Sequence, residues 1–146
     1  MATQEESPMP SVTAQIVAAQ ITPARLWDVL TDSARFPHVI DHVLDVSGTP
    51  DGHENWTVLL NGSKVSWVQR TTLHSQQQLA FEQVTGDLAE LHGTWDLLPT
   101  DGNTTLRLRI EFHLGIDGLA PLLNPIWVQS FQAYADAMVR AVAGAA

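Results

Sequence analysis

Every second residue of the run SKVSWVQRTTLH at 63–74 is hydrophobic or neutral and polar, in the set Val65, Trp67, Gln69, Thr71 and Leu73. If this run is a strand, Trp67, Gln69 and Thr71 lie on one face of it, and Gln83 lies on the same face of the following strand. In a dry core each unpaired polar side chain costs roughly 1–3 kcal/mol. The amides and the hydroxyl therefore predict a wet or ligand-filled pocket, in which they would orient a bound molecule by hydrogen bonds. The alternative is that Gln69 and Gln83 form hydrogen bonds with one another, or with backbone at the edge of the sheet, and have no other role.

Aromatic side chains form a second group, with five tryptophans, four phenylalanines and one tyrosine, Tyr134. Aromatic faces stack on flat polycyclic or polyene molecules, so these rings predict the walls of a pocket for such a ligand. Plain core packing is the alternative for any single ring. Tyr134 is also a candidate catalytic hydroxyl. The candidate ligand-binding residues are Trp56, Trp67, Phe81, Trp95, Leu108, Phe112, Trp127 and Phe131.

Histidine offers the remaining chemistry near neutral pH. His38 and His42 are four residues apart beside the expected mouth of the pocket, where an imidazole can act as an acid or a base. We take His38 as the candidate catalytic residue, with a solvated loop as the alternative. The six histidines show no spacing typical of a zinc site, and the sequence has no cysteine. We expect neither a metal nor another cofactor.

The charge of the chain argues against two classes of partner. Seven Lys and Arg against 16 Asp and Glu give a formal charge of −9, which disfavours nucleic acids and anionic membranes. No run approaches 18 apolar residues, and the N-terminus MATQEESPMP lacks the basic start and apolar stretch of a signal peptide. We therefore expect a cytoplasmic protein, with a disordered leader over residues 1–10 and one domain over residues 11–146.

The elements that would position these side chains follow from periodicity and turn signals. Thr22-Pro23 is an N-cap followed by proline at the first helical position, and Pro37 shortens the next helix. After Pro125, hydrophobic residues recur at the spacing of one face of a helix. The sequence predicts strands at 12–21, 42–49, 53–61, 63–74, 77–85, 88–98 and 103–115, a short helix at 23–30, a second beginning at Asp32 or Ser33, and a long helix at 119–143.

Two tight turns predict the strand register. Asn61-Gly62 and Asp101-Gly102 are typical two-residue type I′ hairpin loops. A slip of one residue would exchange the two faces of the sheet, so the partner pairs test the assignment. The expected partners are Trp56 with Trp67, Val58 with Val65, Trp95 with Leu108, Asp96 with Arg107, His92 with Glu111 and, on the convex face, Arg70 with Glu82.

This order of elements, with RFP at 35–37, FEQVTGDLAELHGTWDLLP at 81–99 and IEFHLG at 110–115, resembles the START/Bet v 1-like (SRPBCC) superfamily. Within it, the sequence is similar to the polyketide cyclase/dehydrase branch, which includes aromatase/cyclases and Coq10-like proteins. The most specific part is the Gly93-x-Trp95 strand. The resemblance implies an α+β helix-grip fold: a curved seven-stranded antiparallel sheet around a long C-terminal helix, with two short helices after the first strand.

The resemblance also bears on catalysis. Aromatase/cyclases carry a Trp-x-Ser-x-Arg alternation, and its Arg is proposed to bind and polarise the polyketide. Here Trp67 matches, Gln69 stands for the Ser and Thr71 for the Arg. Without that buried cation, catalysis would rely on positioning and on neutral groups such as Gln69, Thr71, Gln83 and Tyr134.

The function implied is binding of a hydrophobic, polyketide-like or polycyclic small molecule in an internal pocket, with assistance to its cyclisation or dehydration in secondary metabolism. A non-catalytic carrier or sequestering protein for a quinone, lipid or natural product is the alternative. The expected partner is that small molecule. Delivery by a carrier protein and the choice between monomer and homodimer are left open, and so is a bulge that would turn Arg70 inward.

Overall fold

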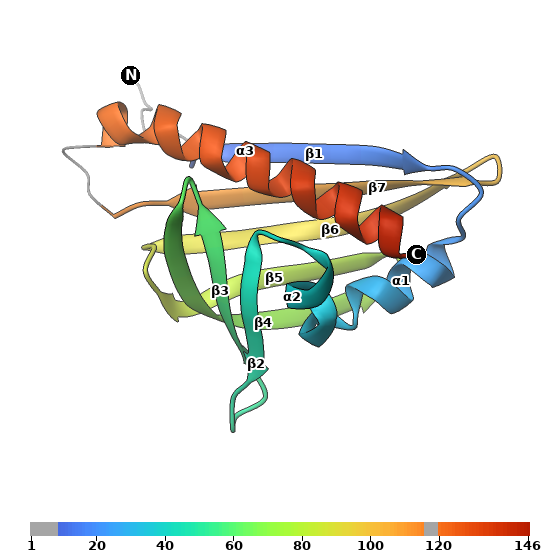
Figure 1. Ribbon diagram of the computed structural model, residues 1–146, viewed down its shortest axis with the longest axis horizontal. Helices are drawn as coiled ribbons and strands as arrows, with labels where there is room; N and C mark the ends of the chain where they lie inside the picture. Colours follow the sequence, from blue (N-terminus) through green and yellow to red (C-terminus); the bar gives the residue numbers. More distant parts are fainter. Residues whose placement is uncertain (1–8, 116–119) are drawn as a thin grey trace, which may run out of the picture.

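A curved antiparallel sheet of seven strands wraps around one long helix in the computed structural model, which describes residues 9–115 and 120–146 (Figure 1). The strands follow the order β1-β7-β6-β5-β4-β3-β2 across the sheet, so the first strand of the chain joins the last. The strands are β1 (Ser11–Ala18), β2 (Val43–Gly48), β3 (Glu54–Leu60), β4 (Ser63–Ser75), β5 (Gln78–Gly86), β6 (Glu90–Thr100) and β7 (Asn103–His113). The helical segments are α1 (Pro23–Leu30), η2 (Ser33–Arg35), α2 (Phe36–Val39) and α3 (Ala120–Ala145).

Helix α3 lies across the concave side of the sheet, and α1 lies near the C-terminal end of α3 (Figure 1). Helix α3 contacts β1, β3 and β7 as well as α1 and α2. Its buried face includes Phe131, Tyr134, Ala135, Met138 and Val142, which recur at helical spacing. The α+β helix-grip architecture expected from the sequence is therefore confirmed.

Both predicted hairpin turns are present, and they hold the predicted register. Asn61 and Asp101 have φ angles of 53° and 47°, and each is followed by a glycine with positive φ, as type I′ loops require. All the predicted partner pairs are confirmed. Arg70 is exposed and forms an ion pair with Glu82 on the convex face, so no bulge turns it toward α3.

The short helical segments place apolar side chains over one end of the sheet. The Thr22 hydroxyl accepts a hydrogen bond from the Arg25 backbone N–H at 3.3 Å, which caps α1 as the sequence predicts. Leu26, Leu30 and Phe36 are buried. These segments therefore form a wall that faces the strands across the end of the core.

Some predictions fall outside the described residues. The leader predicted for residues 1–10 lies outside them except at its last two positions, where the Pro10 carbonyl accepts a hydrogen bond from the Phe112 backbone N–H at 3.1 Å. The first residue of the predicted long helix, 119, also lies outside, and α3 continues to Ala145, past its predicted end. Within residues 9–115 and 120–146, no helix is long and apolar enough to cross a membrane.

Gly93 on β6 provides a test of the packing between the strands and the core. A Cβ at this position would lie 2.3 Å from the Arg109 carbonyl oxygen and 2.6 Å from Cζ of Phe81. Overpacking costs about 1–3 kcal/mol, and more where backbone must move. We expect Gly93→Ala to lower the free energy of unfolding in urea by about 3 kcal/mol.

Gly48→Ala is the matched control, because nothing lies within 4 Å of the Cβ position of Gly48. Its free energy of unfolding should change by less than about 0.5 kcal/mol. Equal stabilities of the two variants would contradict the close approach at Gly93.

Candidate functional site

The space between the sheet and α3 is almost filled by side chains of the protein. Its volume is about 20 Å³, which is room for about one water molecule. Trp56 and Trp67 stack beside it with ring centroids 6.2 Å apart. We call this space the interior pocket; it is lined by Trp56, Trp67, Gln69, Phe81, Leu91, Trp95, Leu108, Ile110, Phe131, Tyr134 and Met138. The internal pocket with room for a small organic molecule, which the sequence led us to expect, is not present between these side chains.

An open groove, the mouth groove, lies beside the short helical segments and has a volume of about 280 Å³. Leu30 and Phe36 line it on the helical side, and Leu79 and Trp95 line it on the sheet side. Gln69 and Trp95 line both this groove and the interior pocket, so the two spaces are adjacent. The full lining consists of Leu30, Thr31, Ser33, Phe36, Gly52, Glu54, Gln69, Thr71, Leu73, Leu79 and Trp95.

Three side chains of β4 form a hydrogen-bonded line from the interior pocket to the mouth groove. The Trp67 indole N–H donates to Oε1 of Gln69 at 3.0 Å, and Nε2 of Gln69 donates to Oγ1 of Thr71 at 3.1 Å. Gln69 is only 5% exposed, and these bonds offset most of the cost of burying its amide. Thr71 is exposed and accepts through its oxygen, so its own hydroxyl hydrogen remains available. The line thus ends in a donor at the mouth.

A carboxylate lines the same groove from the neighbouring strand. Glu54 pairs with Gln69 across β3 and β4. Its Oε1 accepts a hydrogen bond from the Trp56 indole N–H at 3.1 Å, and its Oε2 accepts one from the Ser33 hydroxyl at 2.5 Å. These bonds connect η2 to the pair of stacked tryptophans. The mouth groove therefore combines a hydroxyl donor and a carboxylate acceptor with apolar walls.

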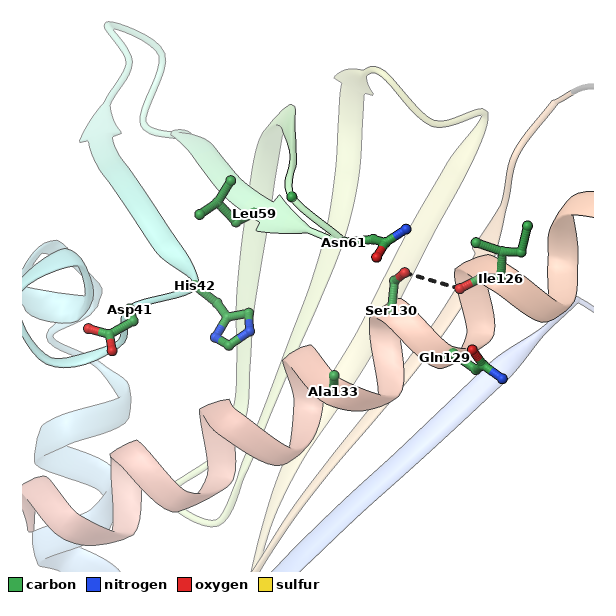
Figure 2. Close-up of a pocket in the computed structure, with 9 residues that line it drawn as sticks. Asp41, His42, Leu59, Asn61, Ile126, Gln129, Ser130 and Ala133 are labelled. Atoms are coloured by element: carbon green, nitrogen blue, oxygen red, sulfur yellow. Dashed lines mark hydrogen bonds between the residues drawn. The ribbon is translucent and has the colours of Figure 1, made fainter.

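A second groove, the outer groove, lies between α3 and the β3–β4 turn and has a volume of about 400 Å³ (Figure 2). The His42 side chain points toward α3, and the Ser130 hydroxyl donates to the Ile126 carbonyl at 3.0 Å. The His42 ring meets Tyr134 edge-on, with centroids 6.3 Å apart. His42 lines the outer groove and Tyr134 lines the interior pocket, so these rings separate the two spaces. Although it is larger, the outer groove does not include Gln69, and we place the candidate site at the mouth groove.

Tyr134, a predicted catalytic residue, is buried in the interior pocket. Among the described residues, no group forms a hydrogen bond with its hydroxyl. Burial raises the pKa of Tyr134 well above its usual range, because the phenolate would lose its hydration. The side chain is therefore a neutral phenol near pH 7.

Two other predicted catalytic residues, Gln83 and His38, line neither the interior pocket nor the mouth groove. Gln83 sits next to Val84, the extra residue of a bulge in β5, and its Nε2 donates to the Leu88 carbonyl at 2.7 Å. Its Oε1 is buried without a partner among the described residues. His38 is exposed on α2 and lines neither the interior pocket nor the mouth groove. Gln69, Thr71 and Tyr134 are the predicted catalytic residues that line one of these spaces.

The predicted ligand-binding residues fall into two groups. Phe112 stacks on Phe131 with centroids 4.5 Å apart, and Trp127 lies 6.2 Å from the same ring. Neither Phe112 nor Trp127 lines the interior pocket or the mouth groove. The other six, namely Trp56, Trp67, Phe81, Trp95, Leu108 and Phe131, line the interior pocket.

Sequence reasoning missed Glu54, Ser33 and Phe36 as lining residues of the mouth groove. For Glu54 a signal was present. In the run ENWTVLL, residue 54 alternates with Trp56, so the carboxylate shares the inward face with the indole. Ser33 and Phe36 carry no such signal, because their positions depend on how the short helices pack.

The family of the chain follows from a comparison with family models. Residues 20–143 match the model described as polyketide cyclase/dehydrase and lipid transport. The match covers most of the chain, so the protein belongs to this family, which confirms the resemblance seen in the sequence. No curated protein matches the chain.

Solved structures of low sequence identity share the fold. TTHA0849 from Thermus thermophilus superposes with a TM-score of 0.82 and 20% identity, over 93% of this chain and 96% of that one. The Zhui aromatase/cyclase from Streptomyces sp. R1128 superposes with a TM-score of 0.81 and 20% identity, over 93% of this chain and 92% of that one. A START superfamily protein from Mycobacterium smegmatis superposes with a TM-score of 0.74 and 12% identity, over 93% of this chain and 99% of that one. At these identities the likeness concerns the fold and does not extend to the ligand.

Tyr134→Phe tests the environment of the buried hydroxyl. At pH 7 we expect the free energy of unfolding to stay unchanged or to rise by up to about 1 kcal/mol, because no hydrogen bond within the described residues is lost. The raised pKa means that the folded protein holds the phenolic proton more tightly than the unfolded chain does. Stability of the wild type should therefore fall as the pH rises above about 10.

The stability of Tyr134→Phe should not show the decrease at high pH that comes from the phenol. Tyr134 is the single tyrosine in the sequence, so no other phenol contributes to this decrease. Urea unfolding at about pH 7 and at several values above about pH 9 measures both effects. A loss of more than about 1 kcal/mol at neutral pH would show that the hydroxyl has a partner.

Proposed function

We propose that the protein binds a flat, hydrophobic, polyketide-like molecule at the mouth groove and assists its cyclisation or dehydration. The observation that carries the proposal is the groove itself, where the line from Trp67 through Gln69 to Thr71 opens between apolar walls. Membership of a family described as polyketide cyclases, dehydrases and lipid transport proteins supports it. The likeness in fold to an aromatase/cyclase is a further argument for the class of ligand.

The composition of the groove suits a planar molecule with few polar groups. Phe36, Trp95, Leu30 and Leu79 reach the groove only with their edges, because each is at most 5% exposed. Leu73, which is 57% exposed, adds an aliphatic side chain at its rim. The volume of about 280 Å³ is near the lower limit of roughly 300 Å³ for small-molecule sites. The bound molecule would therefore remain partly exposed, with one carbonyl oxygen accepting from the Thr71 hydroxyl.

Any catalysis at this site would depend on orientation and neutral donors. Among the described lining residues of the mouth groove and the interior pocket there is no lysine or arginine, so a developing enolate would find no cation. Holding a flexible chain with its reacting carbons together can lower a barrier by roughly 7–11 kcal/mol in favourable cases. In this proposal Thr71 polarises the carbonyl, and Gln69 positions Thr71 through its amide.

A carrier or sequestering protein for a lipophilic molecule is the second candidate. The lack of a cation among the described lining residues favours it, and the description of the family includes lipid transport. The same groove would then bind the molecule without converting it.

Incubation of the protein with a linear poly-β-ketone separates the two candidates. Products that form faster than in the spontaneous reaction, followed by chromatography, support the enzyme. Saturable quenching of tryptophan fluorescence with unchanged products supports the carrier. If a set of linear and polycyclic ketones gives neither turnover nor quenching, the proposal is wrong.

Thr71→Val tests the proposed donor, because valine keeps the shape of threonine and lacks the hydroxyl. We expect affinity, or kcat/KM if there is turnover, to fall about 2- to 12-fold, the equivalent of one hydrogen bond of about 0.5–1.5 kcal/mol. Arg70→Ala is the control, because Arg70 is the adjacent residue and lies on the convex face in an ion pair with Glu82. Equal losses in the two variants would contradict the face that we assign to the ligand.

A further inference from the structure

Glu54 is the one ionisable side chain among the described residues that line the mouth groove. The other polar lining residues, Thr31, Ser33, Gln69 and Thr71, are neutral. Apart from Glu54 and these four, the lining is apolar or glycine. Any charge on a bound molecule therefore meets a single fixed charge, which is negative.

The carboxylate is held in place by donors from two different elements. The Trp56 indole on β3 and the Ser33 hydroxyl on η2 each donate to one of its oxygens. A carboxylate offers about four lone-pair sites, so these two bonds leave acceptor capacity on both oxygens. Glu54 is half-buried, which weakens solvent screening of its charge compared with a fully exposed group.

The nearby arginines do not neutralise this charge. Arg70 lies on the convex face and pairs with Glu82. Arg35, which ends η2, pairs with Asp32 at 3.8 Å, and its side chain does not line the mouth groove. The whole chain, with Glu54 included, has a formal net charge of −9. The electric field around the groove therefore attracts cations and repels anions.

We propose that Glu54 makes the mouth groove selective for flat apolar molecules whose polar end donates hydrogen bonds, such as a phenol, an enol or a protonated amine, and that it rejects carboxylates. This rests on the proposed function, because it assumes that the ligand occupies the mouth groove. The Thr71 hydroxyl, which lines the same groove, supplies a donor in addition to this acceptor. A molecule that carries both a carbonyl acceptor and a hydroxyl donor can therefore use both groups, whereas a free acid would face the carboxylate of Glu54.

Three probes with the same tricyclic ring test the selectivity: 9-anthracenemethanol, 9-anthracenemethylammonium and 9-anthracenecarboxylate. Dissociation constants would be measured at pH 7 and low salt by quenching of tryptophan fluorescence. For the wild type we expect the ammonium to bind about tenfold more tightly than the alcohol, and the carboxylate at least about fivefold more weakly. Added salt should reduce both differences.

Glu54→Gln keeps the size of the side chain and removes the charge. In this variant we expect the three dissociation constants to agree within about threefold, because the charge that ranks the probes is gone. The alcohol should bind somewhat more weakly than it binds the wild type, since an amide oxygen is a weaker acceptor than a carboxylate. An unfolding midpoint in urea equal to that of the wild type shows that the variant is folded. Glu90→Gln, an equal change of charge at an exposed residue at the start of β6, should keep the ranking of the wild type.

The outcomes separate the two proposals. If none of the probes binds the wild type, the proposed site is wrong. If the alcohol binds but the ammonium and the carboxylate bind equally well, the selectivity is wrong and the site stands. A Glu54→Gln variant that folds and keeps the ranking would also overturn the role of Glu54. If that variant does not fold, the ranking and the salt dependence of the wild type decide.

Discussion

Phe36, Trp56 and Trp67 pack as one group of rings between the short helical segments and the sheet. Trp56 stacks on Trp67 with an interplanar angle of 7°, and Phe36 meets Trp56 edge-on at 5.7 Å. From the other side, Phe131 and Tyr134 of α3 fill the remaining space. Because these rings leave only about 20 Å³, a molecule larger than water meets the polar side chains at the mouth but cannot reach the Tyr134 hydroxyl unless a ring moves.

The strand register could be predicted from the sequence, because type I′ turns and the two-residue period of a strand leave one arrangement of the hairpins. Trp56 opposite Trp67 and Asp96 opposite Arg107 follow from the positions of two turns alone. The same period places Glu54 on the same face of β3 as Trp56. Glu54 was therefore predictable as a residue of the site, although the polar residues of β4 alone do not indicate it. Periodicity identifies the face of a residue wherever the ladder is regular.

Volume and local hydrogen bonding could not be predicted in the same way. Gln83 shares the inward face with Gln69, yet its amide reaches the Leu88 carbonyl, and that contact depends on the bulge and on the path of the following turn. The size of the interior pocket depends on how side chains from opposite elements interdigitate, about which the alternation of hydrophobic residues says nothing. The spacing of His38 and His42 predicts His38 beside the mouth of the pocket, whereas its side chain is exposed on α2 and lines neither the interior pocket nor the mouth groove.

The near absence of free volume behind the mouth has a kinetic consequence. A molecule larger than water that moves past Gln69 and Trp95 has to wait for rings of the core to shift, since only about 20 Å³ lies behind them. Entry by such a molecule would then be limited by an internal rearrangement, and its observed association rate would level off as the concentration increases. A molecule held at the surface of the groove would show no such plateau, so stopped-flow measurements distinguish the two depths of binding.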